Sequence, residues 1–94
     1  MKKGYVMKYK AAEHIASRVI KGHALLLASD SDHIYQLNET GTYLWSLILD
    51  ELKTVSELAD ALFAEFDVEY QTAVTDVQIF IDTLSTQGFI TQSS

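Results

Sequence analysis

Histidine is the side chain best suited to acid–base catalysis and metal binding near neutral pH, and this 94-residue chain has three. His14, His23 and His33 are isolated, without the three- or four-residue spacing that places two metal ligands on one helical face. Asp30 and Asp32 precede His33, but the segment lacks the central glycine and distal glutamate of a calcium loop. We interpret this segment as a solvated turn and predict no metal site.

Nucleophilic and phosphate-binding chemistry find equally little support. The chain has no cysteine, which excludes disulfides, thiolate ligands and thiol catalysis. None of its serines is flanked by the glycines of a nucleophile elbow. Its four glycines are too dispersed for a phosphate loop or a dinucleotide fingerprint. We therefore predict a binding protein that is not an enzyme and carries no cofactor.

Composition indicates one small globular domain, since 48% of the residues are hydrophobic and 21% are charged. No apolar run approaches the roughly 18–20 residues of a membrane span. The first residues lack the apolar stretch of a secretory signal. We expect a cytoplasmic protein that does not contact a membrane.

Charge divides the chain unevenly. Residues 1–21 carry six basic side chains against one glutamate, whereas residues 22–94 carry one lysine against twelve carboxylates. We expect residues 1–13 to form a basic, partly disordered N-terminal segment and residues 14–90 to form the folded domain. Nucleic-acid affinity comes mainly from neutralising phosphates, so the acidic body argues against a nucleic-acid partner.

Three strands are predicted in the first part of the domain. Residues 14–20 alternate in polarity, residues 24–28 form a short apolar run, and residues 33–37 alternate again. Lys21, Gly22 and His23 supply a glycine for the tight turn of a hairpin between the first two. The three strands are expected to form an antiparallel meander.

Three helices follow, over roughly residues 39–51, 54–66 and 69–87. Asn38 is suited to cap the first helix, and Thr54 with Glu57 forms a capping box for the second. Gly88 follows the third helix as the expected C′ residue. Trp45, Phe63 and Phe66 are expected in the core, onto which Phe89 and Ile90 fold back. The order β-β-β-α-α-α predicts an α+β fold of winged-helix type: a three-stranded antiparallel sheet followed by three helices.

The third strand is a candidate binding edge. It runs directly into the first helix, so its register is fixed, and a fixed, exposed edge is a template for another chain. In the third helix, Ile79 and Phe80 widen the apolar surface beyond the core-facing stripe. This pattern favours a groove beside the third strand. The same edge would also permit two copies of the chain to pair as a homodimer.

Three linked motifs resemble one known family. Tyr35–Gly41 followed by Leu44 and Trp45, then Thr54–Ala59, then Asp76–Leu84 followed by Gly88–Ile90 are similar to the motifs of PqqD-like proteins. The spacing is intact over roughly residues 14–90. The chain departs from the family in having Glu51–Lys53 where a glycine is usual, and in lacking the N-terminal proline.

The resemblance implies a RiPP recognition element, which is a peptide-binding domain without catalytic residues. Members of this family bind the leader segment of a ribosomally made precursor peptide. They present it to a modifying enzyme, which in pyrroloquinoline quinone biosynthesis is a radical-SAM enzyme. The leader lies as an added strand against the third strand, in a cleft whose other wall is the third helix.

Two sets of residues are expected to form that site. The backbone of the third strand would pair with the leader, the third helix would bury the leader's apolar side chains, and Asp76 at the rim would select a basic leader residue. The predicted peptide-binding residues are His33, Ile34, Tyr35, Gln36, Asp76, Val77, Phe80, Ile81 and Leu84. Leu37, Asn38 and Trp45 are expected to be structural.

Two other functions remain open at this point. A winged-helix regulator that binds nucleic acid would need a basic recognition helix, but residues 69–87 contain no lysine or arginine. A structural subunit would dock on a partner enzyme through its sheet edge without reading a peptide.

Overall fold

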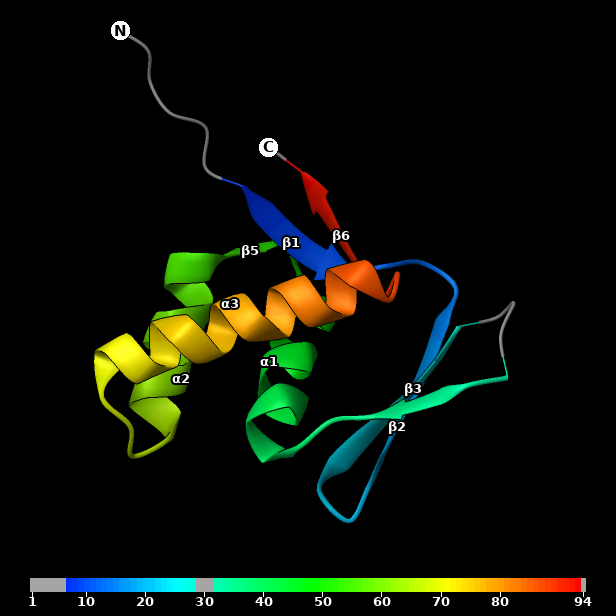
Figure 1. Ribbon diagram of the computed structural model, residues 1–94, viewed down its shortest axis with the longest axis horizontal. Helices are drawn as coiled ribbons and strands as arrows, with labels where there is room; N and C mark the ends of the chain where they lie inside the picture. Colours follow the sequence, from blue (N-terminus) through cyan, green and yellow to red (C-terminus); the bar gives the residue numbers. More distant parts are fainter. Residues whose placement is uncertain (1–6, 29–31, 94) are drawn as a thin grey trace, which may run out of the picture.

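The computed structural model describes residues 7–28 and 32–93. Residues 1–6 of the predicted basic segment and most of the predicted turn at residues 29–32 lie outside the described residues. Figure 1 shows the helices and strands of the chain. They are β1 (Lys8–Ala11), β2 (Ile15–Ile20), β3 (His23–Ala28), β4 (Ile34–Gln36), α1 (Glu39–Asp50), β5 (Lys53–Thr54), α2 (Val55–Glu65), α3 (Tyr70–Thr86) and β6 (Ile90–Ser93).

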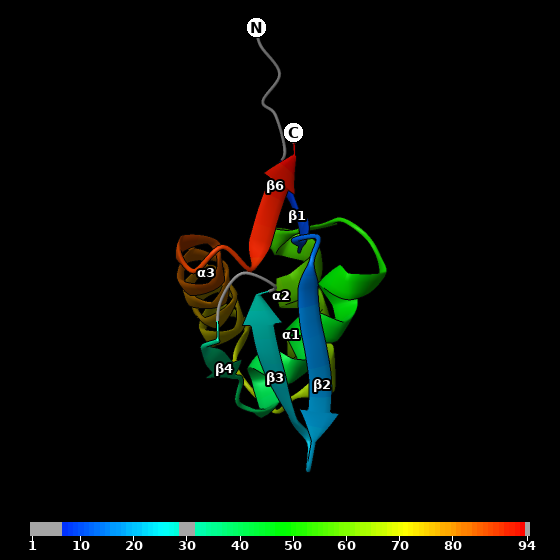
Figure 2. The same ribbon diagram turned by 90° about the vertical axis from the view of Figure 1, so that its right-hand side faces the viewer.

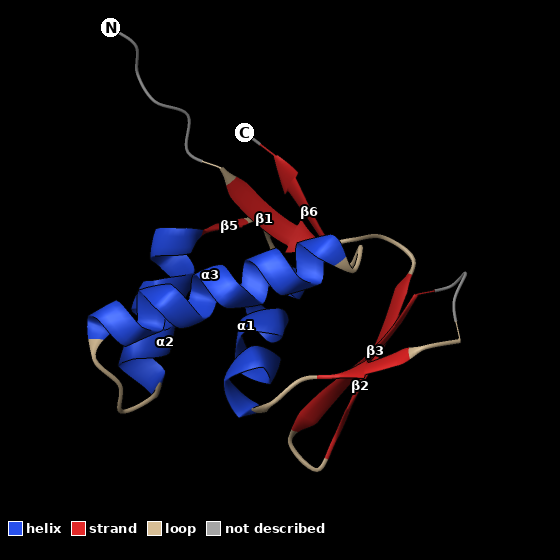
Figure 3. Cartoon of the chain, viewed as in Figure 1, coloured by secondary structure: helices blue, strands red, loops and turns tan. Residues whose placement is uncertain are grey.

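The predicted meander is present as an antiparallel sheet of order β2-β3-β4. Ile20 pairs with His23 across a two-residue turn, in which Lys21 and Gly22 have φ of 54° and 82°. Positive φ at both central residues is typical of the type I′ turn, whose twist matches that of the flanking strands. The predicted α+β class, with this sheet followed by three helices, is confirmed (Figure 3).

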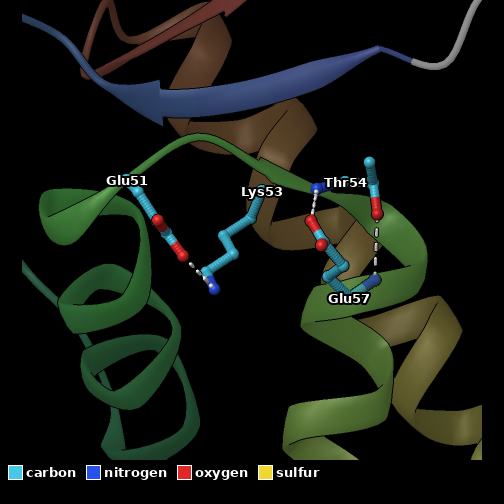
Figure 4. Close-up of polar contacts among 4 residues, drawn as sticks. All are labelled: Glu51, Lys53, Thr54 and Glu57. Atoms are coloured by element: carbon cyan, nitrogen blue, oxygen red, sulfur yellow. Dashed lines mark hydrogen bonds and ion pairs between the residues drawn. The ribbon is translucent and has the colours of Figure 1, made fainter.

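The predicted caps of α2 and α3 are also confirmed. The Thr54 hydroxyl accepts from the Glu57 N–H at 3.0 Å, while the Glu57 carboxylate accepts from the Thr54 N–H at 2.9 Å (Figure 4). After α3, Gly88 has φ of 84°. There the Phe89 N–H donates to the Leu84 carbonyl at 2.8 Å, and the Gly88 N–H donates to Ser85 at 3.1 Å. These bonds form a Schellman motif, which sends the chain back toward the core.

A second antiparallel sheet, of order β5-β1-β6, was not predicted. Its central strand β1 lies within the N-terminal segment, with Lys8 opposite Ser93 and Ala11 opposite Ile90. Lys8 and Lys10 are exposed, while Tyr9 and Ala11 pack against the core. A four-residue strand whose main partner lies some eighty positions away leaves no local periodicity to detect.

The core lies between the helices and the inner faces of both sheets. The residues buried in it are Ala24, Leu26, Leu37, Leu44, Trp45, Ile48, Leu58, Ala59, Leu62, Ala73, Val77, Phe80, Ile81, Leu84, Phe89 and Ile90. The predicted burial of Trp45, Phe89 and Ile90 is therefore confirmed. The prediction for Phe63 is wrong, because this side chain is 49% exposed and contacts Tyr70 edge-on instead. Within the described residues, no helix combines the length and apolarity needed to cross a membrane.

The capping box makes the stability of α2 sensitive to acid. The hydrogen bond from the Thr54 N–H lowers the pKa of Glu57. A carboxylate with a lowered folded-state pKa stabilises the fold above its unfolded pKa, and that contribution is lost as pH falls through the folded value. Glu57→Gln retains an acceptor but cannot ionise. We expect the wild type to be the more stable protein at pH 7, with the difference shrinking toward pH 3.

Denaturant unfolding of both proteins at the two pH values measures this difference. A gap that stays constant or widens at pH 3 would contradict the assigned role of the Glu57 carboxylate.

Candidate functional site

A groove of about 350 Å³ lies between β4 and α3. Figure 2 shows β4 as the strand of its sheet nearest to α3. One wall comes from β4 and the start of α1, and the other comes from one face of α3. The lining residues are Tyr35, Gln36, Leu37, Asn38, Thr40, Gly41, Leu44, Asp76, Ile79, Phe80, Thr83 and Leu84.

The floor of the groove is apolar and belongs to the core. Leu44, Leu84 and Phe80 contribute to it while being only 1%, 1% and 8% exposed. Ile79 stands at the α3 side of the groove and is 58% exposed. An apolar floor with an exposed isoleucine beside it provides a surface on which another apolar side chain can be buried.

The junction between β4 and α1 is held by the backbone of Leu37. Its N–H donates to the Ala24 carbonyl at 2.8 Å, and its carbonyl accepts from Nδ1 of His23 at 2.9 Å. The Ala24 N–H in turn donates to the Thr42 hydroxyl at 2.8 Å. The end of β4 and the first turn of α1 are therefore both fixed to β3. Nothing in the sequence pattern indicated the part that His23 plays here.

Asn38 caps α1 as predicted, and the cap depends on a glycine. Its Oδ1 accepts from the Gly41 N–H at 2.8 Å and from the Thr40 hydroxyl at 3.1 Å. A Cβ on Gly41 would lie 3.1 Å from that Oδ1 and 3.4 Å from the Leu37 Cβ. The glycine lets the first turn of the helix approach the capping side chain closely. The predicted structural roles of Leu37 and Asn38 agree with these contacts.

The register of the sheet decides which backbone groups of β4 are offered to a partner. In an antiparallel ladder the backbone groups of successive residues point alternately toward and away from the neighbouring strand. Because the Leu37 N–H points to β3, the backbone of Tyr35 also points to β3, opposite Leu26. The N–H and C=O groups of Ile34 and Gln36 therefore point outward. Within residues 7–28 and 32–93, no strand pairs with this outer edge, and β6 pairs with β1 instead.

The structure brings together five of the nine predicted site residues. Tyr35, Gln36, Asp76, Phe80 and Leu84 all line the groove. They come from two elements that are separated by some forty positions in the chain, so the fold is what unites them.

The other four predicted residues lie outside the groove lining. Ile34 is 64% exposed beside the groove, and His33 is exposed just before β4 begins. Val77 and Ile81, at 0% and 5% exposure, point into the core and offer no surface to a ligand. The α3 lining residues that were not selected are Ile79 and Thr83, and their signal is the spacing 76, 79/80, 83/84, which marks one helical face.

Asp76 is the one charged side chain among the described residues that line the groove, and it is half-buried. Away from the groove, the hydrogen bond with Glu51 raises the pKa of Lys53, and the hydrogen bond to Asp60 raises the pKa of Tyr70. In the part of the chain that the structure describes, no three His, Cys, Asp or Glu residues are placed to hold a metal ion. The chemistry available at this site is hydrogen bonding, apolar burial and one negative charge.

The residues that build the groove lie within a segment that matches a known family. Residues 23–90 match the family described as coenzyme PQQ synthesis protein D (PqqD). The chain belongs to the PqqD family. Every strand and helix that lines the groove falls within the matched segment, whereas β1 precedes it.

Two solved structures resemble this PqqD-family domain. One is TbiB1 in complex with the TbiA(beta) leader peptide, with 26% sequence identity, a TM-score of 0.78, and coverage of 86% of this chain and 93% of that one. The other is lasso peptide synthetase B1 complexed with the leader peptide, with 23% identity, a TM-score of 0.77, and coverage of 88% and 96%. At that identity the second likeness shows the fold alone. No curated protein matches the chain.

The Asn38 cap gives a direct test of the groove's construction. Asn38→Ala removes the acceptor for the Gly41 N–H and is expected to lower the free energy of unfolding by about 1 kcal/mol. Asn38→Ser keeps a capping oxygen and should lose much less. Denaturant unfolding of the three proteins measures the effect, and an alanine variant as stable as the serine variant would contradict the assigned cap.

Proposed function

We propose that this PqqD-family domain binds the leader segment of a ribosomally made precursor peptide as an added strand on β4. The observation that carries the proposal is that the outward edge of β4 forms one wall of a groove with an apolar floor, whose other wall is α3. The similarity to TbiB1, solved with a leader peptide, supports the same ligand class. The proposed peptide-contacting residues are those predicted from the sequence, without the buried Val77 and Ile81 and with the addition of Ile79.

Backbone pairing supplies affinity without demanding a particular leader sequence. Ile34 and Gln36 offer their N–H and C=O groups to the leader, while the backbone of Tyr35 holds β4 to β3. Alternate side chains of an added strand then face the groove. Val77 and Ile81 contribute indirectly, by fixing α3 against the core from beneath.

Apolar burial in the groove is expected to supply much of the binding free energy. Burying one large apolar side chain contributes roughly 1.5–3 kcal/mol. Two or three such leader residues, packed against Phe80, Leu84 and Ile79, would give micromolar or tighter binding after the cost of ordering the peptide.

The domain acts as a carrier in this proposal, and the bond-making chemistry belongs to a partner enzyme such as a radical-SAM protein. The precursor is a ribosomal product, so we assign the interaction to the cytoplasm. Nucleic acid is disfavoured as a ligand, because the groove-lining helix α3 has no lysine or arginine and its groove-facing charge is Asp76. The experiments below distinguish leader binding from two alternatives, a subunit that docks on an enzyme without binding a peptide and a homodimer formed through the same edge.

Proline substitution tests strand addition. Ile34→Pro deletes an outward N–H of β4 without removing a bond to β3, so the fold is expected to persist while leader affinity falls at least tenfold. Val19→Pro is the matched control. It too is an exposed, β-branched residue, and its pairing with Ala24 directs its N–H outward at the opposite edge of the same sheet.

Titration of a labelled leader peptide against both variants, with circular dichroism to confirm folding, measures the difference. Equal affinities for folded Ile34→Pro and Val19→Pro proteins would reject strand addition at β4. Self-pairing at this edge would instead make the affinity depend on protein concentration.

The exposed isoleucine provides a second test, of the α3 wall. Ile79→Ala removes apolar surface from the groove but nothing from the core, so it should weaken leader binding by about 1–2 kcal/mol with little change in thermal stability. Leu49→Ala is the control, because Leu49 is 48% exposed on α1 and lies outside the groove lining. A leader affinity that the two variants reduce equally would mean that the α3 wall does not contact the peptide.

A further inference from the structure

The charge of the groove is unbalanced within the protein itself. Asp76 is half-buried, and among the described residues no lysine or arginine forms an ion pair with it. A carboxylate that has lost part of its hydration gains from a cation brought into the same place. The cation would have to arrive with the ligand.

The charge of the rest of the domain also favours a cationic ligand. Across residues 22–94 the single lysine is Lys53, against twelve carboxylates. Lys53 is occupied, since its Nζ lies 2.9 Å from the Glu51 carboxylate (Figure 4). With a net charge of −6, the protein attracts a basic peptide more than an acidic one.

The groove also has a direction. The Tyr35 ring packs against Phe89, with ring centroids 5.9 Å apart, and Phe89 follows the C-terminal end of α3. Tyr35 and Leu84 therefore mark one end of the groove. Asp76 lies about two helical turns nearer the N-terminus of α3, which corresponds to a rise of about 12 Å from Asp76 to Leu84.

An extended peptide rises about 3.3 Å per residue, so about four residues span the same length. Residues four apart in a strand point to the same side, whereas residues three apart point to opposite sides. For a bound segment that runs along α3, a side chain seated at the Tyr35 end and a side chain reaching Asp76 are therefore four positions apart.

We propose that, given the leader binding argued above, the groove selects a segment with a lysine or arginine four residues from an apolar anchor. The anchor enters the end formed by Tyr35 and Leu84, and the cation pairs with the Asp76 carboxylate. This assigns to the leader both a charge and a spacing.

Labelled twelve-residue peptides with a polar host sequence and one central leucine test the proposal by fluorescence anisotropy. In one series, lysine, glutamine or glutamate is placed four residues from the leucine. In a second series, lysine is placed three residues from it. Each series is made with the substituted residue before the leucine and, in separate peptides, after it. In one of the two directions, the peptide with lysine four residues from the leucine is expected to bind roughly three- to tenfold more tightly than the glutamine peptide. The glutamate peptide is expected to bind more weakly than the glutamine peptide. Lysine at three should bind like glutamine.

Variants assign the preference to one carboxylate. Asp76→Asn should abolish the advantage of lysine over glutamine, and Asp76→Lys should favour glutamate. Asp82→Asn is the matched control, because Asp82 is exposed on the same helix and lies outside the groove lining. It should retain the full preference.

The outcomes separate this inference from the proposed function. Peptides that bind to the wild type without regard to charge or spacing would overturn the selection rule and leave strand addition standing. A preference lost equally in Asp82→Asn would overturn the assignment to Asp76 in favour of the general acidic field. Failure of all these peptides to bind would overturn the selection rule, while strand addition is tested separately by the Ile34→Pro and Val19→Pro proteins.

Discussion

Leu37 is held by its backbone on both sides, by the Ala24 carbonyl and by the ring of His23, and the arrangement of the groove depends on this attachment. Because its N–H is directed to β3, the position of Leu37 decides which backbone groups of the short strand β4 point toward β3 and which point outward. The attachment also sets where α1 starts, since Asn38 follows immediately and caps the helix. One residue thus determines both the direction of the β4 backbone groups and the position of α1.

The outward edge of β4 stays available because the rest of the chain is engaged elsewhere. The Schellman motif at Gly88 turns Phe89 and Ile90 into the core, and β6 then pairs with β1. A tail that continued past α3 in another direction could have covered β4 itself. The small second sheet therefore contributes to the site without touching a ligand, by keeping the last strand away from the groove.

Much of this fold could be predicted because its strongest signals are local. The capping box at Thr54, the turn at Lys21 and Gly22, and the glycine after α3 each act over a few residues, and all were found. Strand β1 could not be found in this way, because its pairing with β6 is set by tertiary contact. Within the site, spacing placed Ile79 and Phe80 together and could have separated them from the buried Val77, but only the fold shows that this face of α3 meets β4 in a groove.

The pairing of Lys8 with Ser93 has a consequence for how such a domain is joined to other proteins. Whatever precedes β1 and whatever follows β6 depart from neighbouring strands of one small sheet, at the same corner of the molecule (Figure 1). A domain whose entry and exit adjoin can be placed within a surface loop of a larger enzyme, with only short connectors and little disturbance to either partner. The groove, built from β4 and α3, would stay open in such a fusion.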